Sequence, residues 1–331
     1  MDTLRIGTLG AARITPVALL KPAEKNARVT VTAVAARDRE RAERFASKRG
    51  IPRVLESYDA LVTDPDIDAV YIPLPNSHHA EWTLAALEAG KHVLCEKPFT
   101  ANADEARVIQ HVADQHPELV VMEAFHWRYH PLARAVIALL RDGEIGALER
   151  VEVTMAIPLV MRNDIRWQLE LAGGTMMDVG CYTVSMLRHF AREEPTVTHA
   201  SVLEKSAGVD RRVDADFDFP SGATGKITAS MLSRTVLWIG ARITGADGSV
   251  RIVNPVAPQY FHRCTVRTDS GSRRLSFPRS ETSYGNQLEA FAAAVLDSAP
   301  VLTPPADSVA NMQVIDDVYA AAGMAPRPAR I

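Results

Sequence analysis

The sequence predicts an α/β protein with two domains: a doubly wound parallel sheet first, then an α+β domain on an open, mainly antiparallel sheet. In the first 125 or so residues, short apolar runs alternate with helical patterns. This is typical of βαβ units around a sheet that is buried on both faces. After Pro131, longer runs alternate apolar with polar side chains, as antiparallel strands with one packed face do. We expect domains over 1–125 and 126–322, and a flexible tail over 323–331.

Five apolar runs predict the strands of the first domain. They lie at 4–9, 29–35, 69–72, 92–95 and 120–124. Helix-like stretches between them lie at 39–49, 79–88 and 103–115. Strands and helices that alternate in this way join through right-handed crossovers.

The second domain opens with a predicted helix at 132–141 that ends at Asp142-Gly143. Strands with alternating polarity are predicted at 148–157, 197–203, 213–219, 224–231 and 236–244. A helix at 174–189 interrupts them, and helices at 286–296 and 308–321 close the chain. Asp214, Asp216 and Asp218 alternate with apolar residues, so we assign them to the wet face of a strand and not to a metal site.

Composition excludes several classes of protein. The 331 residues carry a net charge of −3, which favours neither nucleic acid nor an anionic membrane as a partner. No apolar run approaches the ~20 residues that span a bilayer. Three scattered cysteines argue against disulfides and a cysteine-based zinc site, and favour a cytoplasmic location. His126 and His130 lack a third ligand, so no metal is expected.

The first predicted strand runs into a glycine-containing loop, Gly10-Ala11-Ala12-Arg13-Ile14-Thr15. In the dinucleotide fingerprint G-x-G-x-x-G, Gly10, Ala12 and Thr15 take the three glycine places. Alanine adds only a methyl group, so backbone amides could still hold phosphate at the helix N-terminus. The loop alone does not separate a nucleotide site from an ordinary strand-to-helix turn.

The end of the second strand, Ala35-Ala36-Arg37-Asp38, bears on the choice of cofactor. An NAD site usually has an acid there, whereas a small residue followed by arginine suits the 2′-phosphate of NADP. We therefore expect Arg37 to bind NADP, with NAD the less favoured cofactor. Arg39 and Arg41 are either helpers or solvated residues. Asp38 is either a displaced NAD acid or, as we favour, the N-cap of the next helix.

Two polar segments end at the carboxyl edge of the predicted sheet, where doubly wound folds bind ligands. They are 71–79, which includes Leu74, Pro75, Asn76 and His79, and 90–98, which ends in Glu96-Lys97-Pro98. A buried glutamate and lysine are costly unless they are paired or used. By spacing alone, a Glu96–Lys97 pair at the domain seam is as good an interpretation as catalysis.

Four segments together resemble the glucose–fructose oxidoreductase / inositol dehydrogenase / MocA family, in which a Rossmann domain precedes a substrate domain. They are residues 10–14, 73–77, 89–98 and 173–182. Within the family the chain is most similar to the dimeric dihydrodiol dehydrogenase and D-xylose dehydrogenase branch. That similarity lies in residues 35–38, in Met122-Glu123-Ala124 with Trp127 and Arg128, and in the Asp178 to Tyr182 run.

The resemblance implies a catalytic lysine–tyrosine pair, Lys97 and Tyr182, with Asp178 beside it. Oxidation of an alcohol needs a base as hydride leaves, and a free tyrosine with a pKa near ~10 is a poor one at neutral pH. A nearby ammonium is expected to lower that value. In reduction, Tyr182 donates the proton. Asp178 either binds a substrate hydroxyl or holds Lys97.

The resemblance also implies the residues that line the cofactor. They are Gly10, Ala11, Ala12, Arg13, Ile14, Arg37, Leu74, Pro75, Asn76, His79, Glu96, Lys97, Arg128 and Trp167. Asn76 could equally cap the following helix. Arg166 and Trp167 either shape the pocket or lie in a solvated loop. Ser185 stands where many relatives carry an acid.

The implied function is NADP-dependent hydride transfer at a CH–OH or C=O carbon of a sugar, polyol or vicinal diol. The alternative is a catalytically silent nucleotide sensor, which the presence of Lys97 and Tyr182 disfavours. Loops at 162–171 and 254–262 are expected to set specificity. A homodimer through the second sheet is expected, because a broad apolar face needs a partner.

Overall fold

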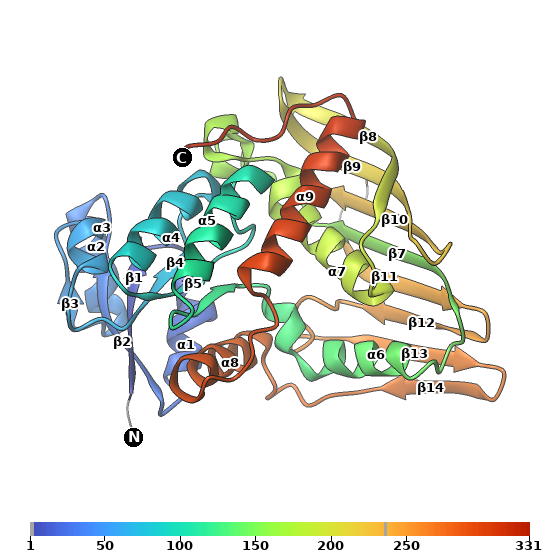
Figure 1. Ribbon diagram of the computed structural model, residues 1–331, viewed down its shortest axis with the longest axis horizontal. Helices are drawn as coiled ribbons and strands as arrows, with labels where there is room; N and C mark the ends of the chain where they lie inside the picture. Colours follow the sequence, from blue (N-terminus) through green and yellow to red (C-terminus); the bar gives the residue numbers. More distant parts are fainter. Residues whose placement is uncertain (1–2, 235–236) are drawn as a thin grey trace.

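The computed structural model describes residues 3–234 and 237–331 and contains two sheets (Figure 1). The first is parallel, in the order β3-β2-β1-β4-β5-β6. Its strands are β1 (Leu4–Leu9), β2 (Val29–Ala35), β3 (Arg53–Val54), β4 (Ala69–Ile72), β5 (His92–Cys95) and β6 (Val121–Glu123). The strand order reverses between β1 and β4, which is where such sheets bind their ligands.

Helices cover both faces of the first sheet, so its central strands are mostly apolar, and every residue of β4 is buried. They are α1 (Lys21–Ala23), α2 (Arg39–Arg49), α3 (Tyr58–Val62), α4 (His79–Glu88) and α5 (Ala103–Gln115). The Asp38 side chain accepts a hydrogen bond from the Arg41 amide, which confirms the N-cap interpretation of Asp38. The sequence missed β3 and α3, because elements this short leave no clear periodicity.

The second sheet has the order β14-β13-β12-β11-β7-β10-β9-β8. Its strands are β7 (Leu148–Ala156), β8 (Thr196–Ser206), β9 (Val209–Asp218), β10 (Thr224–Ser230), β11 (Trp238–Gly245), β12 (Gly248–Val253), β13 (Arg263–Thr268) and β14 (Gly271–Leu275). Only β7 and β10 pair in parallel, so the predicted fold class is confirmed. The predicted strand start at residue 236 lies outside the described residues. The sequence missed β12, β13 and β14; exposed arginines interrupt the apolar pattern in β13 and β14.

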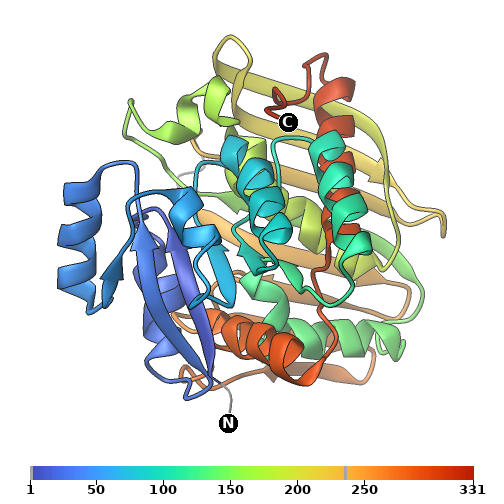
Figure 2. The same cartoon turned by 60° about the vertical axis from the view of Figure 1, so that its left-hand side comes forward.

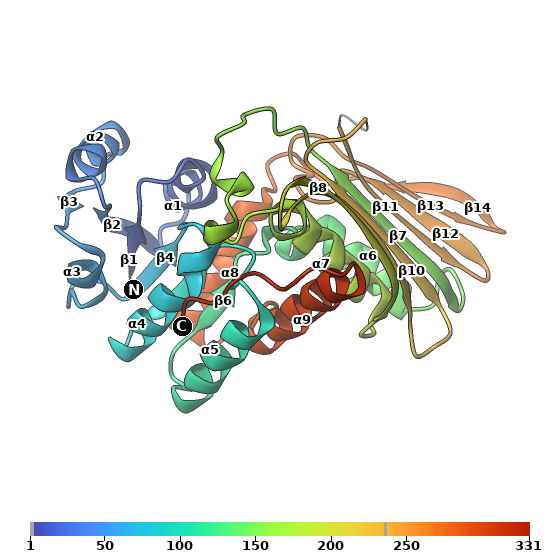
Figure 3. The ribbon, with the colours of Figure 1, turned by 90° about the horizontal axis from the view of Figure 1, so that it is seen from above.

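Helices α6 (Pro131–Arg141), α7 (Cys181–Ala191) and α9 (Pro305–Ala321) lie on one side of the second sheet (Figure 3). The other side is uncovered, and most of its side chains are polar. One row across it runs, in register, through Arg251, Arg242, Glu152, Lys226 and Asp216. The expectation of a broad apolar outer face is therefore wrong, because most apolar residues of the strands turn toward the helices; Leu203 and Trp238 are exposed exceptions.

Helix α8 (Ser283–Asp297) follows the second sheet in the chain but packs on the first (Figure 2). Leu288 and Phe291 of α8 are fully buried in one cluster with Leu4, Ile6 and Tyr71. The two domains are therefore joined through helices. Helix α8 returns to the first sheet, and α5 of the first domain lies beside α9 of the second. No helix among the described residues is long and apolar enough to cross a membrane.

The tail that was predicted to be flexible is anchored instead. Arg327 is 2% exposed and forms an ion pair with the buried Asp210 of β9. The proline-rich composition of this segment concealed the buried arginine that anchors it.

The buried carboxyl of Glu123, at the end of β6, makes the stability of the fold depend on pH. It is 1% exposed, and burial raises its pKa to about 8, with Asp307 adding to the rise. The folded state therefore holds a proton that the unfolded chain releases above its ordinary pKa of ~4.3. Between about pH 4.5 and 8 the free energy of unfolding should fall, by on the order of 3–5 kcal/mol.

In Glu123→Gln this loss should be absent, so the variant gains stability relative to the wild type as pH rises. Urea unfolding at several pH values measures it, with the exposed Glu40→Gln as control. Parallel pH profiles for Glu123→Gln and the wild type would contradict the assignment.

Candidate active site

The loop after β1 turns at Gly10, whose φ of +89° is costly for other residues. Its amide donates to the Ala35 carbonyl at the end of β2, at 2.6 Å. A Cβ at Gly10 would lie 3.1 Å from the Leu74 side chain, so the loops after β1 and β4 pack closely. Next come Ala11, Ala12, Arg13 and Ile14, of which only Arg13 is exposed, and then a π-helical turn, Pro16–Leu20.

Two arginines stand beside this loop. Arg37 is exposed at the end of β2, and the Arg41 guanidinium donates to the Ala11 carbonyl at 2.9 Å. Arg41 is thus a neighbour of the loop, whereas Arg39 forms an exposed ion pair with Glu43 on α2. A pair of cations beside a glycine turn fits the phosphates of a dinucleotide.

The loop after β4 is tied to both domains. The His79 ring nitrogens lie 2.7 Å from the Pro98 carbonyl oxygen and 2.9 Å from that of Leu74. Burial lowers the pKa of His79 to about 4, so the ring is neutral. Asn76 donates to the Ala172 carbonyl in the second domain at 2.9 Å, and it does not cap α4. Pro75 immediately precedes it, half buried.

Glu96 and Lys97 leave β5 in different directions. The Tyr71 hydroxyl donates to Glu96 at 2.8 Å, and burial raises the pKa of Glu96 although Lys97 opposes the rise. The Lys97 ammonium instead donates to Asp178, to the carbonyl at 2.8 Å and to the carboxylate at 3.2 Å. The interpretation in which Glu96 and Lys97 simply pair with each other is not what the structure shows.

Asp178 sits between two cations from different elements. One carboxylate oxygen accepts from Lys97, and the other lies 2.9 Å from the Arg166 guanidinium. Burial alone would raise the pKa of Asp178, but Lys97 and Arg166 outweigh it and the pKa is lowered. Burial likewise opposes the charge on Lys97, yet Asp178 keeps the Lys97 pKa above its ordinary value. All three groups are therefore ionised at neutral pH.

Tyr182 lies on the first turn of α7, just after a π-helical turn, Met176–Gly180, that carries Asp178. Its ring centroid is 5.0 Å from the Lys97 ammonium, and Phe125 packs edge-on against it. Among the described residues, its hydroxyl has no hydrogen-bond partner. Irregular π turns are frequent at functional sites.

The expected lowering of the Tyr182 pKa is wrong for this arrangement. Burial raises the pKa of Tyr182 well above its ordinary value, and Tyr284 and Glu96 add to the rise. The ammonium of Lys97 is near the ring but does not offset the loss of hydration. Tyr182 is thus a neutral phenol that holds its proton.

Arg128 and Trp167 are not brought to this cluster. Arg128 contacts His189 and lies 3.5 Å from Asp307, within the second domain. The Trp167 indole donates to the Met161 carbonyl at 3.1 Å, and the Lys205 ammonium stands over its ring. Other protein groups therefore hold both side chains. Trp127 is fully buried against Phe190, and Ser185 is buried on α7.

The sequence did not single out Tyr284, which stacks on His126 at a centroid distance of 4.0 Å. His126 in turn lies edge-on to Tyr182, so an aromatic group from α8 backs the site. Tyr284 is about a hundred residues along the chain from Tyr182, and nothing in its neighbours marks it. Arg166 stood on a loop without periodicity, so its contact with Asp178 had only a weak signal.

Comparison with known proteins decides the family. Residues 4–124 match the family model described as an oxidoreductase family with an NAD-binding Rossmann fold. Residues 133–251 match the GFO/IDH/MocA C-terminal domain. The chain belongs to the GFO/IDH/MocA family. The resemblance drawn from the sequence is thereby confirmed.

Individual relatives agree with this assignment. The chain is 37% identical to a D-xylose 1-dehydrogenase (NADP(+)) of Haloferax volcanii, over 96% of this chain and 97% of that one. It is 36% identical to a trans-1,2-dihydrobenzene-1,2-diol dehydrogenase of Oryctolagus cuniculus, over 68% of each chain. A 3-ketoreductase from Actinomadura kijaniata, solved with NADP and TDP-benzene, superimposes with a TM-score of 0.88 at 29% identity, covering 97% of this chain and 98% of that one. The chain is therefore an NAD(P)-dependent oxidoreductase of a family that acts on sugars and related alcohols.

Proposed function

We propose that the protein is an NADP-dependent oxidoreductase that moves a hydride between nicotinamide and a CH–OH or C=O carbon of a sugar, polyol or vicinal diol. Tyr182 acts as acid and base, and Lys97 assists it. The observation that carries the proposal is the pair itself. At the carboxyl end of β5, the Lys97 ammonium lies 5.0 Å from the ring of a tyrosine whose hydroxyl has no hydrogen-bond partner among the described residues.

The charges assign a role to each side chain. Tyr182 keeps its proton because burial raises its pKa, so it can deliver that proton to the oxygen of a carbonyl as hydride arrives. The Lys97 ammonium stabilises the negative charge that develops on that oxygen. Both carboxylate oxygens of Asp178 are paired, one with Lys97 and one with Arg166. Asp178 therefore positions the ammonium and does not act as a base. A protonated Tyr182 is the form that the reduction step requires.

The preference for NADP rests on the end of β2. No acid faces the ribose position there, because Asp38 is engaged as the N-cap of α2. Arg37 is exposed at that place, with Arg41 close to the loop. When bound, the cofactor supplies the hydride; the arginines would hold its 2′-phosphate. The D-xylose dehydrogenase named above also uses NADP.

Two loops reach the site and would select the substrate. In the loop at 162–171, Arg166 contacts Asp178 directly. In the loop at 254–262, Gln259 accepts from Ser283 at 3.2 Å, and Ser283 in turn contacts His126, which packs on Tyr182. Hydroxyl-rich substrates suit the charged and hydrogen-bonding groups on these loops. A silent nucleotide sensor is disfavoured, since the named relatives are enzymes.

We also propose a homodimer through the uncovered side of the second sheet. Complementary charge, and not apolar area, would hold the two protomers together. The β11–β14 half of that side carries exposed arginines, and the β9 half carries aspartates: Arg242, Arg251, Arg263, Arg267 and Arg274 against Asp214, Asp216 and Asp218. A two-fold axis parallel to the strands places the basic half of one protomer over the acidic half of the other.

A cytoplasmic location is proposed from the cysteines. Cys95, Cys181 and Cys264 are all free and buried, as expected of a chain that folds in a reducing compartment. Fractionation of cells that express the protein checks this, and recovery outside the cytoplasm would contradict it.

Tyr182→Phe should abolish proton delivery while the fold and the cofactor site persist. We expect kcat to fall by about 10²–10⁴-fold with little change in NADPH affinity. NADPH absorbance, followed with a panel of aldoses, polyols, vicinal diols and keto-sugars in both directions, measures it. If Tyr182→Phe turns over at the wild-type rate, another residue supplies the proton.

Arg37→Ala should weaken binding of NADPH by about tenfold or more and leave NADH unaffected, because one guanidinium–phosphate contact is lost. Fluorescence titration of each cofactor provides both dissociation constants, with the exposed Arg39→Ala, at the first residue of α2, as control. Equal losses for the two cofactors would place Arg37 away from the 2′-phosphate.

The dimer should weaken as salt rises, and Arg251→Glu should raise its dissociation constant by about tenfold. Sedimentation velocity at micromolar protein measures both effects. A wild-type protein that sediments only as a monomer removes the proposal.

A further inference from the structure

The carboxyl-terminal segment after α9 contributes Arg327 to a buried polar cluster. The other two members are Asp210 of β9 and Tyr319 of α9. The Arg327 guanidinium pairs with one Asp210 oxygen, and it also donates to the Tyr319 hydroxyl at 2.6 Å and to the Gly208 carbonyl at 2.8 Å. The Tyr319 hydroxyl donates to Asp210 at 2.9 Å. The side chains of Arg327 and Asp210 are 1% and 0% exposed, so the ion pair is fully buried.

The second Asp210 oxygen faces the helix that carries the catalytic groups. It accepts from the Met176 amide at 2.6 Å, at the start of the π-helical turn that holds Asp178 and leads into Tyr182. Gly174 lies against the same cluster. A Cβ at Gly174 would overlap both the Asp210 carboxylate and the Arg327 guanidinium. The start of this helix is therefore fitted closely onto the ion pair.

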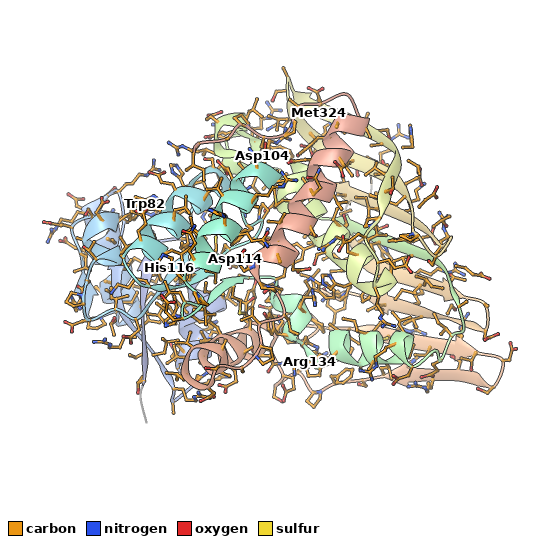
Figure 4. All side chains as sticks on the ribbon, viewed as in Figure 1. Trp82, Asp104, Asp114, His116, Arg134 and Met324 are labelled. Carbon is orange, nitrogen blue, oxygen red and sulfur yellow. The ribbon has the colours of Figure 1, made fainter. Side chains whose placement is uncertain are left out.

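The same segment also binds the element that follows Lys97. Asn102 is the N-cap of α5 and donates from its side chain to the Arg327 carbonyl at 2.9 Å. Farther along, the Arg330 amide donates to Glu105 at 2.6 Å. Figure 1 shows the segment (red) leaving α9 and crossing to the first domain, and Figure 4 places Met324, near its start, at the same end of the molecule as Asp104 of α5.

We propose that Arg327 is a positioning residue for catalysis: through Asp210 it fixes the start of the helix that carries Asp178 and Tyr182 relative to Lys97. The segment from 323 to 331 thus acts as a strap between the two halves of the catalytic pair. The kinetic part of this inference rests on the proposed roles of Lys97 and Tyr182. The mechanical link between Arg327 and the helix start does not depend on them.

The chemistry of the cluster agrees with positioning rather than with bulk stability. A buried ion pair costs much of its attraction in lost hydration, and apolar packing of the same volume is often as stable. The ion pair adds a fixed orientation of the Asp210 carboxylate. The aspartate has one oxygen for the strap and one for the helix, and an apolar side chain could not transmit that constraint.

The test compares Arg327→Met with Arg327→Lys in the full-length protein. Two readouts are used: hydrogen exchange of the backbone over residues 174–182, and kcat per NADPH-binding site, so that any unfolded fraction does not count. For Arg327→Met we expect exchange over 174–182 to rise by about tenfold or more and kcat to fall similarly, with NADPH affinity within about threefold of wild type. Arg327→Lys, which keeps the charge, should recover part of both.

Arg273→Met is the control for loss of an arginine charge, because it removes an exposed arginine–carboxylate pair with Glu144 at the far edge of the second sheet. It should change neither readout. If Arg327→Met does not fold, Tyr319→Phe replaces it, since that change removes the hydrogen bonds that the Tyr319 hydroxyl makes with Asp210 and Arg327 and keeps the charges. Unchanged exchange over 174–182, or exchange that rises equally over the whole chain, overturns the proposal.

The two readouts also separate this proposal from the proposed function. Faster exchange over 174–182 with Tyr182→Phe fully active would retain the mechanical link and remove the catalytic roles. Unchanged exchange with Tyr182→Phe inactive would retain the catalytic roles and remove the link.

Discussion

The arrangement of the site depends on one carboxylate, that of Asp178. It receives Lys97 from the first domain and Arg166 from a loop of the second, and both cations keep it ionised in spite of burial. Without it, the buried Lys97 ammonium would lose its hydrogen-bonded anion. The side chain would then lose its proton or move toward solvent. The charged states of Lys97, Asp178 and Arg166 therefore depend on this contact across the domain seam.

Burial and charge compete at Tyr182, and burial dominates. A sequence shows that a lysine and a tyrosine belong together, but it does not show how much water each has lost. Here the Lys97 ammonium donates hydrogen bonds to the carbonyl and the carboxylate of Asp178, at 2.8 and 3.2 Å. It contacts Tyr182 only over the face of the ring. In the proposed mechanism Tyr182 is therefore the acid, and that proposal depends on how deeply its ring is buried.

The regular parts of the fold could be predicted because they repeat. Apart from the short β3, the strands from β1 to β11 were marked by continuous apolar runs or by a period of 2 residues, and the longer helices by a period of 3.6; only their ends shift. The Lys97–Tyr182 pair was reached through segment resemblance. What remained hidden rests on single long-range contacts, Tyr284 on His126 and Arg327 on Asp210. A contact between residues far apart in the chain leaves no periodic mark in either segment.

Helix α8 has a consequence for how the chain is made. The first sheet is complete in sequence after β6, yet Leu4, Ile6 and Tyr71 are covered by Leu288 and Phe291 of a helix that is synthesised last but one. On the ribosome, the nucleotide domain must wait with an apolar face uncovered until Ser283–Asp297 emerges. The gene segment for the first 125 residues is for the same reason not a portable module: moved alone into another protein, it would leave its own core open.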